Sequence, residues 1–180
     1  MALSVRLRGN ESLGDRLLKV NHAGEHGAVN IYRAQLLLAR WTAPSMVAEL
    51  KEFKSHEERH RAVFRDELQR RHRPRCRSYW LCGVGGYVLG LSTALFGRRA
   101  MAATTVAVER VVLRHLEQQL RALAGTDETA VAAIRSIVGE EQAHHDRSVS
   151  HTRGDGFWIK LLAPVVSLST ELVIWVGMRA

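Results

Sequence analysis

The sequence is poor in proline, the strongest helix breaker, and in patterns that build strands. Its 180 residues include only three prolines, Pro44, Pro74 and Pro164, and aromatic residues make up 6%. The alternation of β-branched and polar residues that marks a half-buried strand is scarce. These absences favour an all-α protein. Apolar residues make up 46% of the chain, which is enough for one domain with a hydrophobic core over residues 1–180.

Cysteine is also rare, and a secretion signal is lacking. Cys76 and Cys82 stand alone, so a disulfide framework and a cysteine-rich metal site are both excluded. They suit a reducing compartment. The apolar stretch after Met1 is too short for the central region of a signal peptide. We therefore expect a chain that is mature at Met1 and lies on the cytoplasmic side in a bacterium.

Acidic residues are outnumbered, with 18 Asp and Glu against 26 Lys and Arg, for a net charge of +8. Such a surplus calls for a negatively charged neighbour, either nucleic acid or anionic lipid. No recognition helix, aromatic platform or known nucleic-acid-binding module accompanies the arginines. The composition therefore predicts an anionic membrane surface as the partner, and no nucleic acid.

Apolar residues at helical spacing predict a series of helices and no strand. Ser12 and Asp15 can form the capping pair of the first helix. Gly125-Thr126-Asp127 reads as a helix end, a turn and a new helix start. The expected amphipathic helices cover about 12–40, 45–71, 100–123 and the stretch from this turn to about 150. Two apolar helices are expected at about 79–97 and 157–178.

A shift of the sequence by 84 positions reveals an internal repeat. Each half, about 12–72 and 100–151, has a Glu followed 32 residues later by Glu-x-x-His. The matching pairs are Glu25 with Glu109, Glu57 with Glu141, and His60 with His144. Neighbouring positions do not match, since His56 falls on Glu140 and His26 on Arg110. The two halves match at residues of the types that bind metals and not at their neighbours, which predicts a metal site.

Helix geometry brings these residues together. Residues three apart share a helix face, so Glu57 and His60 point the same way, as do Glu141 and His144. In each antiparallel hairpin the partner glutamate, Glu25 or Glu109, lies at about the same height. Two facing hairpins therefore place four carboxylates and two imidazoles in one bundle core. This is the ligand set of ferritin-like proteins that hold two iron or two manganese ions.

Two divalent irons per subunit would neutralise carboxylates that otherwise repel one another. Carboxylate and imidazole ligands suit iron, whereas structural zinc favours closed, thiolate-rich sites. The two-fold repeat makes Glu57 and Glu141 the natural bridging ligands. Glu25 and His60 then complete one iron, and Glu109 and His144 the other. Gly24 and Gly27 flank Glu25 in its helix, which suggests that room is needed beside the metal.

Other histidine patterns have alternative readings. His56 to His60 spells H-E-x-x-H and His22 to His26 spells H-x-x-E-H, both patterns of zinc proteases. Neither recurs in the other half, and the β-sheet that accompanies such motifs is not expected here. His115 either supports the ligands through a hydrogen bond or is an ordinary histidine on a helix surface.

The uncharged run of residues 79–97 is long enough to cross a membrane. A simple crossing would separate the two halves of one metal site, so a helix lying in the membrane interface is expected instead. An ordinary core helix or an oligomer contact is the alternative. The last helix is interrupted by Lys160, Pro164 and Glu171 and is also expected to be interfacial. The flanking cations are Arg70, Arg71, Arg73, Arg75, Arg77, Arg98 and Arg99.

From Asp15 to the C-terminus the chain resembles the demethoxyubiquinone hydroxylase family of ubiquinone biosynthesis. The stretches that carry the resemblance are DRLLKVNHAGEHGA (15–28), the EERH at 57–60, TVAVE ending at Glu109, and EEQAHHD (140–146). All six ligand positions of the family are present, and a histidine at the position of His115 also matches. The resemblance implies the same ferritin-like bundle and two irons per subunit.

The resemblance further implies O2-dependent hydroxylation of 2-polyprenyl-3-methyl-6-methoxy-1,4-benzoquinol. It implies peripheral attachment to the inner membrane, which we expect at the cytoplasmic face in a bacterium. Other ubiquinone-biosynthesis proteins and further copies of the chain, in a homo-oligomer, are candidate partners, and the sequence leaves the oligomeric state open. The chain has no Gly-rich dinucleotide fingerprint, so electrons are expected from outside or from the quinol itself. A ferritin-like iron-storage or ferroxidase protein is the alternative function, since it shares the Glu-x-x-His pairs.

Overall fold

The computed structural model describes residues 5–152 and 156–179 of the chain, and within these ranges it is helical and without strands. One short 3-10 turn, η1, covers Pro44–Met46. The α-helices are α1 (Leu13–Thr42), α2 (Val47–Arg70), α3 (Tyr79–Ala94), α4 (Arg98–Leu123), α5 (Glu128–Thr152) and α6 (Gly156–Arg179). The all-α prediction is confirmed.

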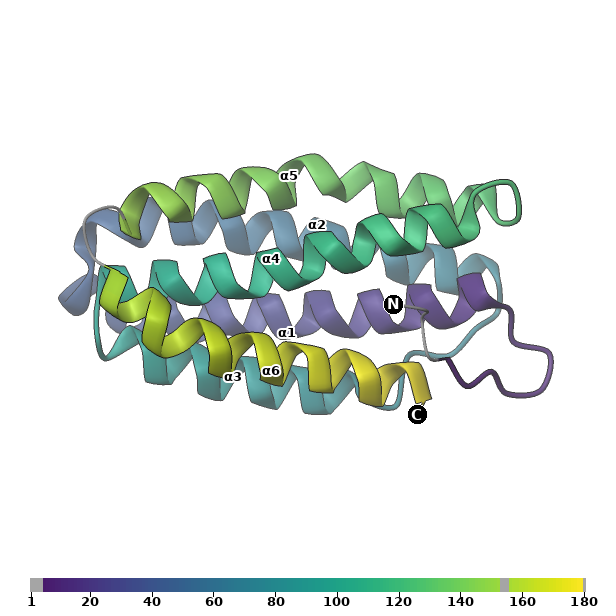
Figure 1. The fold of residues 1–180 in the computed structure, drawn as a ribbon, viewed down its shortest axis with the longest axis horizontal. Helices are drawn as coiled ribbons and strands as arrows, with labels where there is room; N and C mark the ends of the chain where they lie inside the picture. The colour runs from purple at the N-terminus through teal and green to yellow at the C-terminus, as the bar shows by residue number, and fades with distance from the viewer. Residues whose placement is uncertain (1–4, 153–155, 180) are drawn as a thin grey trace.

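The helices form three layers (Figure 1). α1 and α4 lie in the middle, α2 and α5 cover them on one side, and α3 and α6 lie on the other. α1, α2, α4 and α5 form the ferritin-like four-helix bundle. α3 packs against α1 and α6 against α4, so the order α1-α2-α3 recurs as α4-α5-α6. Each half therefore has an apolar helix as a third element, which the repeat of ligand residues did not predict.

Most predicted helix ends are confirmed to within a few residues. Ser12 caps α1, its hydroxyl accepting from the backbone N–H of Asp15 while the Asp15 carboxylate accepts from the backbone of Ser12. The second helix begins at Val47, later than expected, because η1 takes up the residues after Ala43. The apolar helix ends at Ala94, short of the expected 97, and Gly97 has a φ of 78°. The connection expected between about 150 and 157 includes residues 153–155, which lie outside the described residues.

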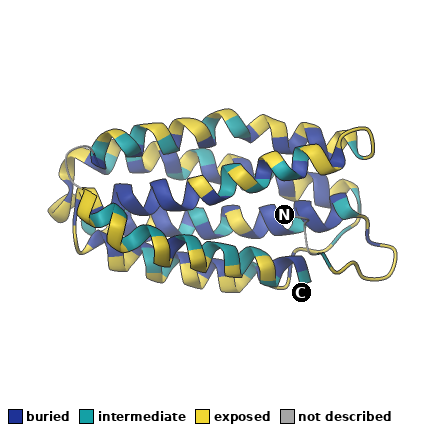
Figure 2. Cartoon of the chain, in the orientation of Figure 1, coloured by how far each residue is buried: buried dark blue, intermediate teal, exposed yellow. Residues whose placement is uncertain are grey.

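The helices bury the faces that they turn toward one another and expose their outer faces (Figure 2). One core cluster joins α1, α2, α4 and α5, and seven of its members are at most 1% exposed, namely Leu17, Leu18, Phe64, Leu123, Ala130, Ile134 and Ile137. A second cluster fills the other end of the bundle around Tyr32 and Phe53. The ligand-type residues lie in the same interior.

Glycines let α3 approach α1 closely. A Cβ at Gly86 would lie 2.2 Å from the backbone oxygen of Gly27, and one at Gly90 would lie 2.3 Å from that of Ile31. Gly27 also lies against α3, because a Cβ there would be 3.2 Å from the backbone oxygen of Cys82; the interpretation of Gly27 as room beside a metal stays a prediction. A Cβ at Gly24 would meet nothing within 4 Å.

We expect Gly86→Ala to destabilise the fold by about 1–3 kcal/mol, because overpacking forces α3 away from α1. Gly85→Ala is the matched control, since a Cβ at Gly85 meets nothing within 4 Å. Alanine in that helical position should stabilise the fold by up to about 1 kcal/mol. Denaturant unfolding of the two variants measures both changes. Equal effects would show that α3 does not depend on this contact.

Candidate metal centre and adjoining cavity

Six buried side chains meet in the interior of the four-helix bundle. Each of α1 and α4 supplies one glutamate, and each of α2 and α5 supplies a Glu-x-x-His pair. All are at most 6% exposed although every one is polar: Glu25, Glu57, His60, Glu109, Glu141 and His144. Buried polar groups of this kind need compensating partners, because desolvation of an isolated charge is costly.

The six residues form two overlapping groups of four. One contains Glu25 and His60, the other contains Glu109 and His144, and Glu57 and Glu141 belong to both. In each group the ligand atoms all lie within 4.8 Å of one another. The arrangement predicted from the repeat, with two shared carboxylates between two terminal sets, is therefore the one that the side chains adopt.

The imidazoles face the carboxylates crosswise. His60 Nδ1 lies 2.9 Å from Glu141 Oε1 and 3.6 Å from Glu57 Oε2, its own i−3 neighbour. His144 Nδ1 lies 3.1 Å from Glu57 Oε1 and 3.7 Å from Glu141 Oε2. Each histidine is thus closer to the glutamate of the other repeat, as expected for a centre with pseudo-two-fold symmetry.

Despite these short contacts, several of the buried atoms make no hydrogen bond with favourable angles. They are Nδ1 of His60, Nδ1 of His144 and both carboxylate oxygens of Glu57. Buried polar atoms are normally satisfied, so a cluster of unsatisfied donors of electron pairs requires an explanation. A cation between them would satisfy all four. The residues present therefore fit a site for divalent metal ions with oxygen and nitrogen ligands.

Burial and the charges of neighbouring side chains shift the pKa values of the carboxylates in the cluster. Burial, followed by the charges of Glu141 and Glu57, raises the pKa of both Glu25 and Glu109 well above the ordinary value. Burial also raises the pKa of Glu141, but the His144 and His60 rings outweigh it and hold that pKa at about 2. Without metal, Glu25 and Glu109 therefore tend to hold protons at the positions where cations would bind.

The two imidazoles hold protons tightly when metal is absent. Burial lowers their pKa, but the Glu141 and Glu57 carboxylates outweigh it and raise the pKa of His60 to about 10. The same two carboxylates raise the pKa of His144 to about 9. Both rings are therefore cationic at neutral pH, and each must lose a proton before Nδ1 can bind a metal.

Two aromatic side chains, Tyr32 and Phe53, also contact the six residues, although the internal repeat did not predict them. Tyr32 is 2% exposed, and its hydroxyl donates to Glu109 Oε1 at 3.4 Å. Burial and the Glu109 charge raise the pKa of Tyr32 well above its usual value, so it stays a donor. Phe53 packs on the His144 ring with centroids 4.2 Å apart. The shift by 84 aligns Tyr32 with Leu116 and Phe53 with Ile137, so the repeat gave no signal for either.

The other histidines lie outside the two ligand groups. His22 and His26 flank Tyr79, and His26 stacks on its ring at 4.0 Å. His56 Nδ1 lies 2.9 Å from Nε2 of His144, so it touches a ligand-type residue but does not face the carboxylates. Neither zinc-protease pattern brings its two histidines together in a ligand group. His115 Nε2 lies 2.8 Å from Glu171 Oε2 on α6, so the hydrogen bond of this nitrogen goes to α6 and not to one of the six residues.

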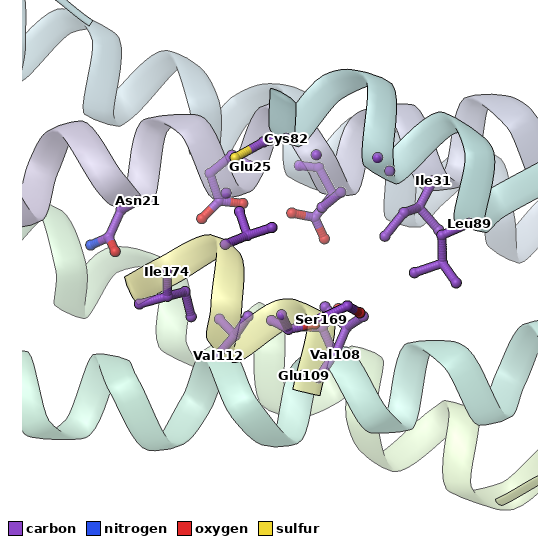
Figure 3. Close-up of a pocket in the computed structure, with 18 of the residues that line it drawn as sticks. Asn21, Glu25, Ile31, Cys82, Leu89, Val108, Glu109, Val112, Ser169 and Ile174 are labelled. Atoms are coloured by element: carbon purple, nitrogen blue, oxygen red, sulfur yellow. The ribbon is translucent and has the colours of Figure 1, made fainter. Parts of the chain in front are cut away.

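A cavity of about 540 Å³ adjoins the carboxylates. Glu25, Glu57, Glu109 and Glu141 form part of its wall, and most of the remaining wall is apolar, drawn from α1, α3, α4 and α6. Figure 3 shows Glu25 on α1 and Glu109 on α4 beside such side chains. The wall also contains Asn21 and Gln119, whose amides bond each other at 2.7 and 3.1 Å.

The cavity lies between helices that touch each other little. α3 packs on α1 and α6 on α4, while α3 and α6 make few contacts with each other. Leu81 and Val88 of α3 line the cavity and are more than half exposed. An apolar molecule can therefore reach the carboxylates from the surface formed by α3 and α6.

Comparison with known proteins places the chain among enzymes of one pathway. The family model described as ubiquinone biosynthesis protein COQ7 matches residues 12–177. The 3-demethoxyubiquinol 3-hydroxylase of Rhodospirillum rubrum is 36% identical over 180 residues, which cover 97% of this chain and 83% of that protein.

Eukaryotic relatives match over similar lengths. The NADPH-dependent 3-demethoxyubiquinone 3-hydroxylase of Dictyostelium discoideum, a mitochondrial protein, is 33% identical over 92% of this chain and 76% of its own length. The mitochondrial protein of the same name from Mus musculus is 31% identical over 94% of this chain and 79% of its own length.

Proposed function

The chain belongs to the COQ7 family of ubiquinone biosynthesis proteins, and from this we propose that it hydroxylates demethoxyubiquinol, 2-polyprenyl-3-methyl-6-methoxy-1,4-benzoquinol, with O2. The observation that carries the proposal is the pair of overlapping carboxylate–imidazole groups in the wall of an apolar cavity. We further propose that residues 1–180 form one ferritin-like domain built from two repeats. The relatives named above are hydroxylases, and they give the iron-storage alternative no support.

We infer that the six buried residues hold two irons per subunit. Glu25 and His60 would bind one iron, Glu109 and His144 the other, and Glu57 and Glu141 would bridge them. When bound, the iron pair supplies the activation of O2 that a ring hydroxylation requires. The reaction places one oxygen atom on the ring and reduces the other to water with two electrons and two protons. The electrons come from an external donor or from the quinol.

The cavity supplies the substrate site in this proposal. Its apolar wall excludes water from the ring and favours binding of an aromatic quinol. The Asn21–Gln119 amide pair and His115 are polar groups in the wall that can hydrogen-bond the ring oxygens. The prenyl tail would leave between α3 and α6 and remain in lipid.

We propose that the protein attaches to a membrane through the outer surface of α3, the turn after α3, and α6, which we call the apolar face. It carries thirteen large apolar side chains that are at least 37% exposed: Trp80, Leu81, Val84, Val88, Leu91, Leu95, Phe96, Phe157, Leu161, Val165, Leu168, Leu172 and Trp175. Exposed apolar patches of this extent mark protein or membrane contacts. We propose that this face lies on the cytoplasmic side of the inner membrane.

The apolar helices are proposed to lie along the membrane surface. Among the described residues, α6 is the one helix long and apolar enough to cross a membrane. It nevertheless runs beside α4 (Figure 1), and Val166 is buried against the bundle. α3 has 16 residues, fewer than the roughly 20 that a span requires. An interfacial position lets both helices contact lipid at once.

The flanking arginines divide into two groups. Arg70, Arg71 and Arg73 have acidic partners within the protein, namely Glu67, Asp127 and Asp15. Arg75 and Arg77, before α3, and Arg98 and Arg99, at the start of α4, are exposed and can meet anionic head groups. The expectation that the whole cluster serves lipid is therefore narrowed to the second group.

Metal binding should release protons. At pH 7 the His60 and His144 rings are protonated without metal, because their pKa values are about 10 and about 9. Each ring that binds metal through Nδ1 loses that proton, so affinity should rise about tenfold or more per pH unit between pH 6 and 8. Calorimetric titration with Mn²⁺ in buffers of different ionisation enthalpy measures the release. Heat that is independent of buffer, with flat affinity, would contradict the proposed ligands.

A further inference from the structure

The outward nitrogen of each ligand imidazole contacts a side chain of the facing helix. His60 on α2 points Nε2 at Glu140 Oε2 on α5, at 2.8 Å. His144 on α5 points Nε2 at His56 Nδ1 on α2, at 2.9 Å. In both cases the residue contacted comes directly before a Glu-x-x-His pair. Each ligand histidine is therefore held by a residue of the other repeat.

These two outer partners occupy equivalent positions but differ in chemistry. The shift by 84 that aligns the ligands places His56 on Glu140. Glu140 is a carboxylate, held in place by Arg59 at 3.0 and 3.3 Å. His56 is an imidazole whose Nε2 lies 3.9 Å from Glu52 and whose Nδ1, besides contacting His144, lies 3.7 Å from the Glu140 carboxylate. The six ligand-type residues are thus related by the repeat, but the side chains that contact their two histidines from outside are not.

The difference bears on how strongly each imidazole donates electrons. A histidine that binds metal through Nδ1 carries its proton on Nε2 and must donate it in a hydrogen bond. A carboxylate acceptor makes this bond charge-assisted and makes the imidazole a stronger ligand. A neutral imidazole acceptor strengthens the metal-binding imidazole less than a carboxylate does. His60 should therefore be the stronger donor of the two.

We propose that His56 and Glu140 are positioning residues that fix the two imidazoles and make the two metal positions chemically unequal. The metal held by His60 has the stronger imidazole donor and favours the ferric state. On one-electron reduction the added electron therefore resides on the iron held by His144. This inference rests on the proposed two-iron site and is independent of the identity of the substrate.

Mössbauer spectroscopy of protein loaded with ⁵⁷Fe tests the inequality. In the diferric wild type we expect two quadrupole doublets of equal area. Glu140→Gln gives both imidazoles a neutral acceptor, and His56→Glu gives both a carboxylate, so each variant should at least halve the difference between the doublets. A single doublet in the wild type, or two that neither variant moves, would overturn the inference.

Matched variants separate positioning from damage to the fold. Glu58→Gln and His145→Gln change the same residue types nearby, where Glu58 bonds Lys54 and His145 bonds Asp146, and they should leave the doublets unchanged. Glu140→Ala should weaken Mn²⁺ binding about 10–100-fold, and Glu140→Gln should restore most of it. A wild type with two equivalent irons would overturn this inference alone. A wild type that binds fewer than two would also overturn the proposed centre.

Discussion

Glu141→Ala should remove most of both irons from a protein that still folds. Glu141 belongs to both ligand groups, so its loss takes one oxygen ligand from each metal. Its removal also relieves a repulsion, because the Glu141 charge helps to raise the pKa of Glu25 and Glu109. We expect hydroxylation to fall by more than about 100-fold, since even outer partners of metal ligands contribute 10–100-fold. Iron analysis and circular dichroism measure the two effects.

Two comparisons sharpen this expectation. Glu25→Ala should weaken one metal position more than the other, because Glu25 belongs to a single group. Glu58→Ala, next to Glu57 in sequence but exposed and paired with Lys54, should keep both irons and full activity. One tightly bound zinc with His56 as a ligand would contradict the assignment.

Placing two acids on the apolar face should release the protein from membranes. Val84 on α3 and Leu168 on α6 are 64% and 72% exposed. Burial of each such side chain in lipid contributes about 1.5–3 kcal/mol, and a carboxylate in its place opposes insertion. The double variant Val84→Asp/Leu168→Asp should therefore bind vesicles more weakly by a factor of about 1000 or more. Co-sedimentation with vesicles that contain anionic lipid measures the change.

The control adds the same charges to the opposite layer. Gln69 on α2 and Ala132 on α5 are exposed, so Gln69→Asp/Ala132→Asp matches the change in net charge away from the apolar face. We expect it to bind vesicles almost as the wild type does. A Val84→Asp/Leu168→Asp variant that keeps vesicle binding but loses self-association would assign the face to a second copy of the chain instead.

The sequence was informative where local geometry fixes the outcome. The i, i+3 spacing of Glu57 and His60 determines a shared helix face, and the hairpin around η1 brings Glu25 to the same height. The repeat then gave all six residues that the structure brings together. Helix ends with side-chain caps, such as Ser12, were also predictable.

Contacts between helices were harder to predict because no local rule specifies them. The pairing of His56 with His144 and of Glu140 with His60 depends on the rotation of α2 against α5. The hydroxyl of Tyr32 meets Glu109 from another helix, 77 positions away. At Gly27 α3 crosses closely, a contact that becomes visible only once α3 is placed against α1.

The most direct measurement supplies reduced demethoxyubiquinol and ¹⁸O₂ to the purified, iron-loaded protein and follows the ring by mass spectrometry. We expect a single labelled oxygen on the ring, and no labelled product from Glu141→Ala. Oxygen consumption that leaves the ring unlabelled would contradict hydroxylation and indicate an oxidase or a ferroxidase on the same bundle.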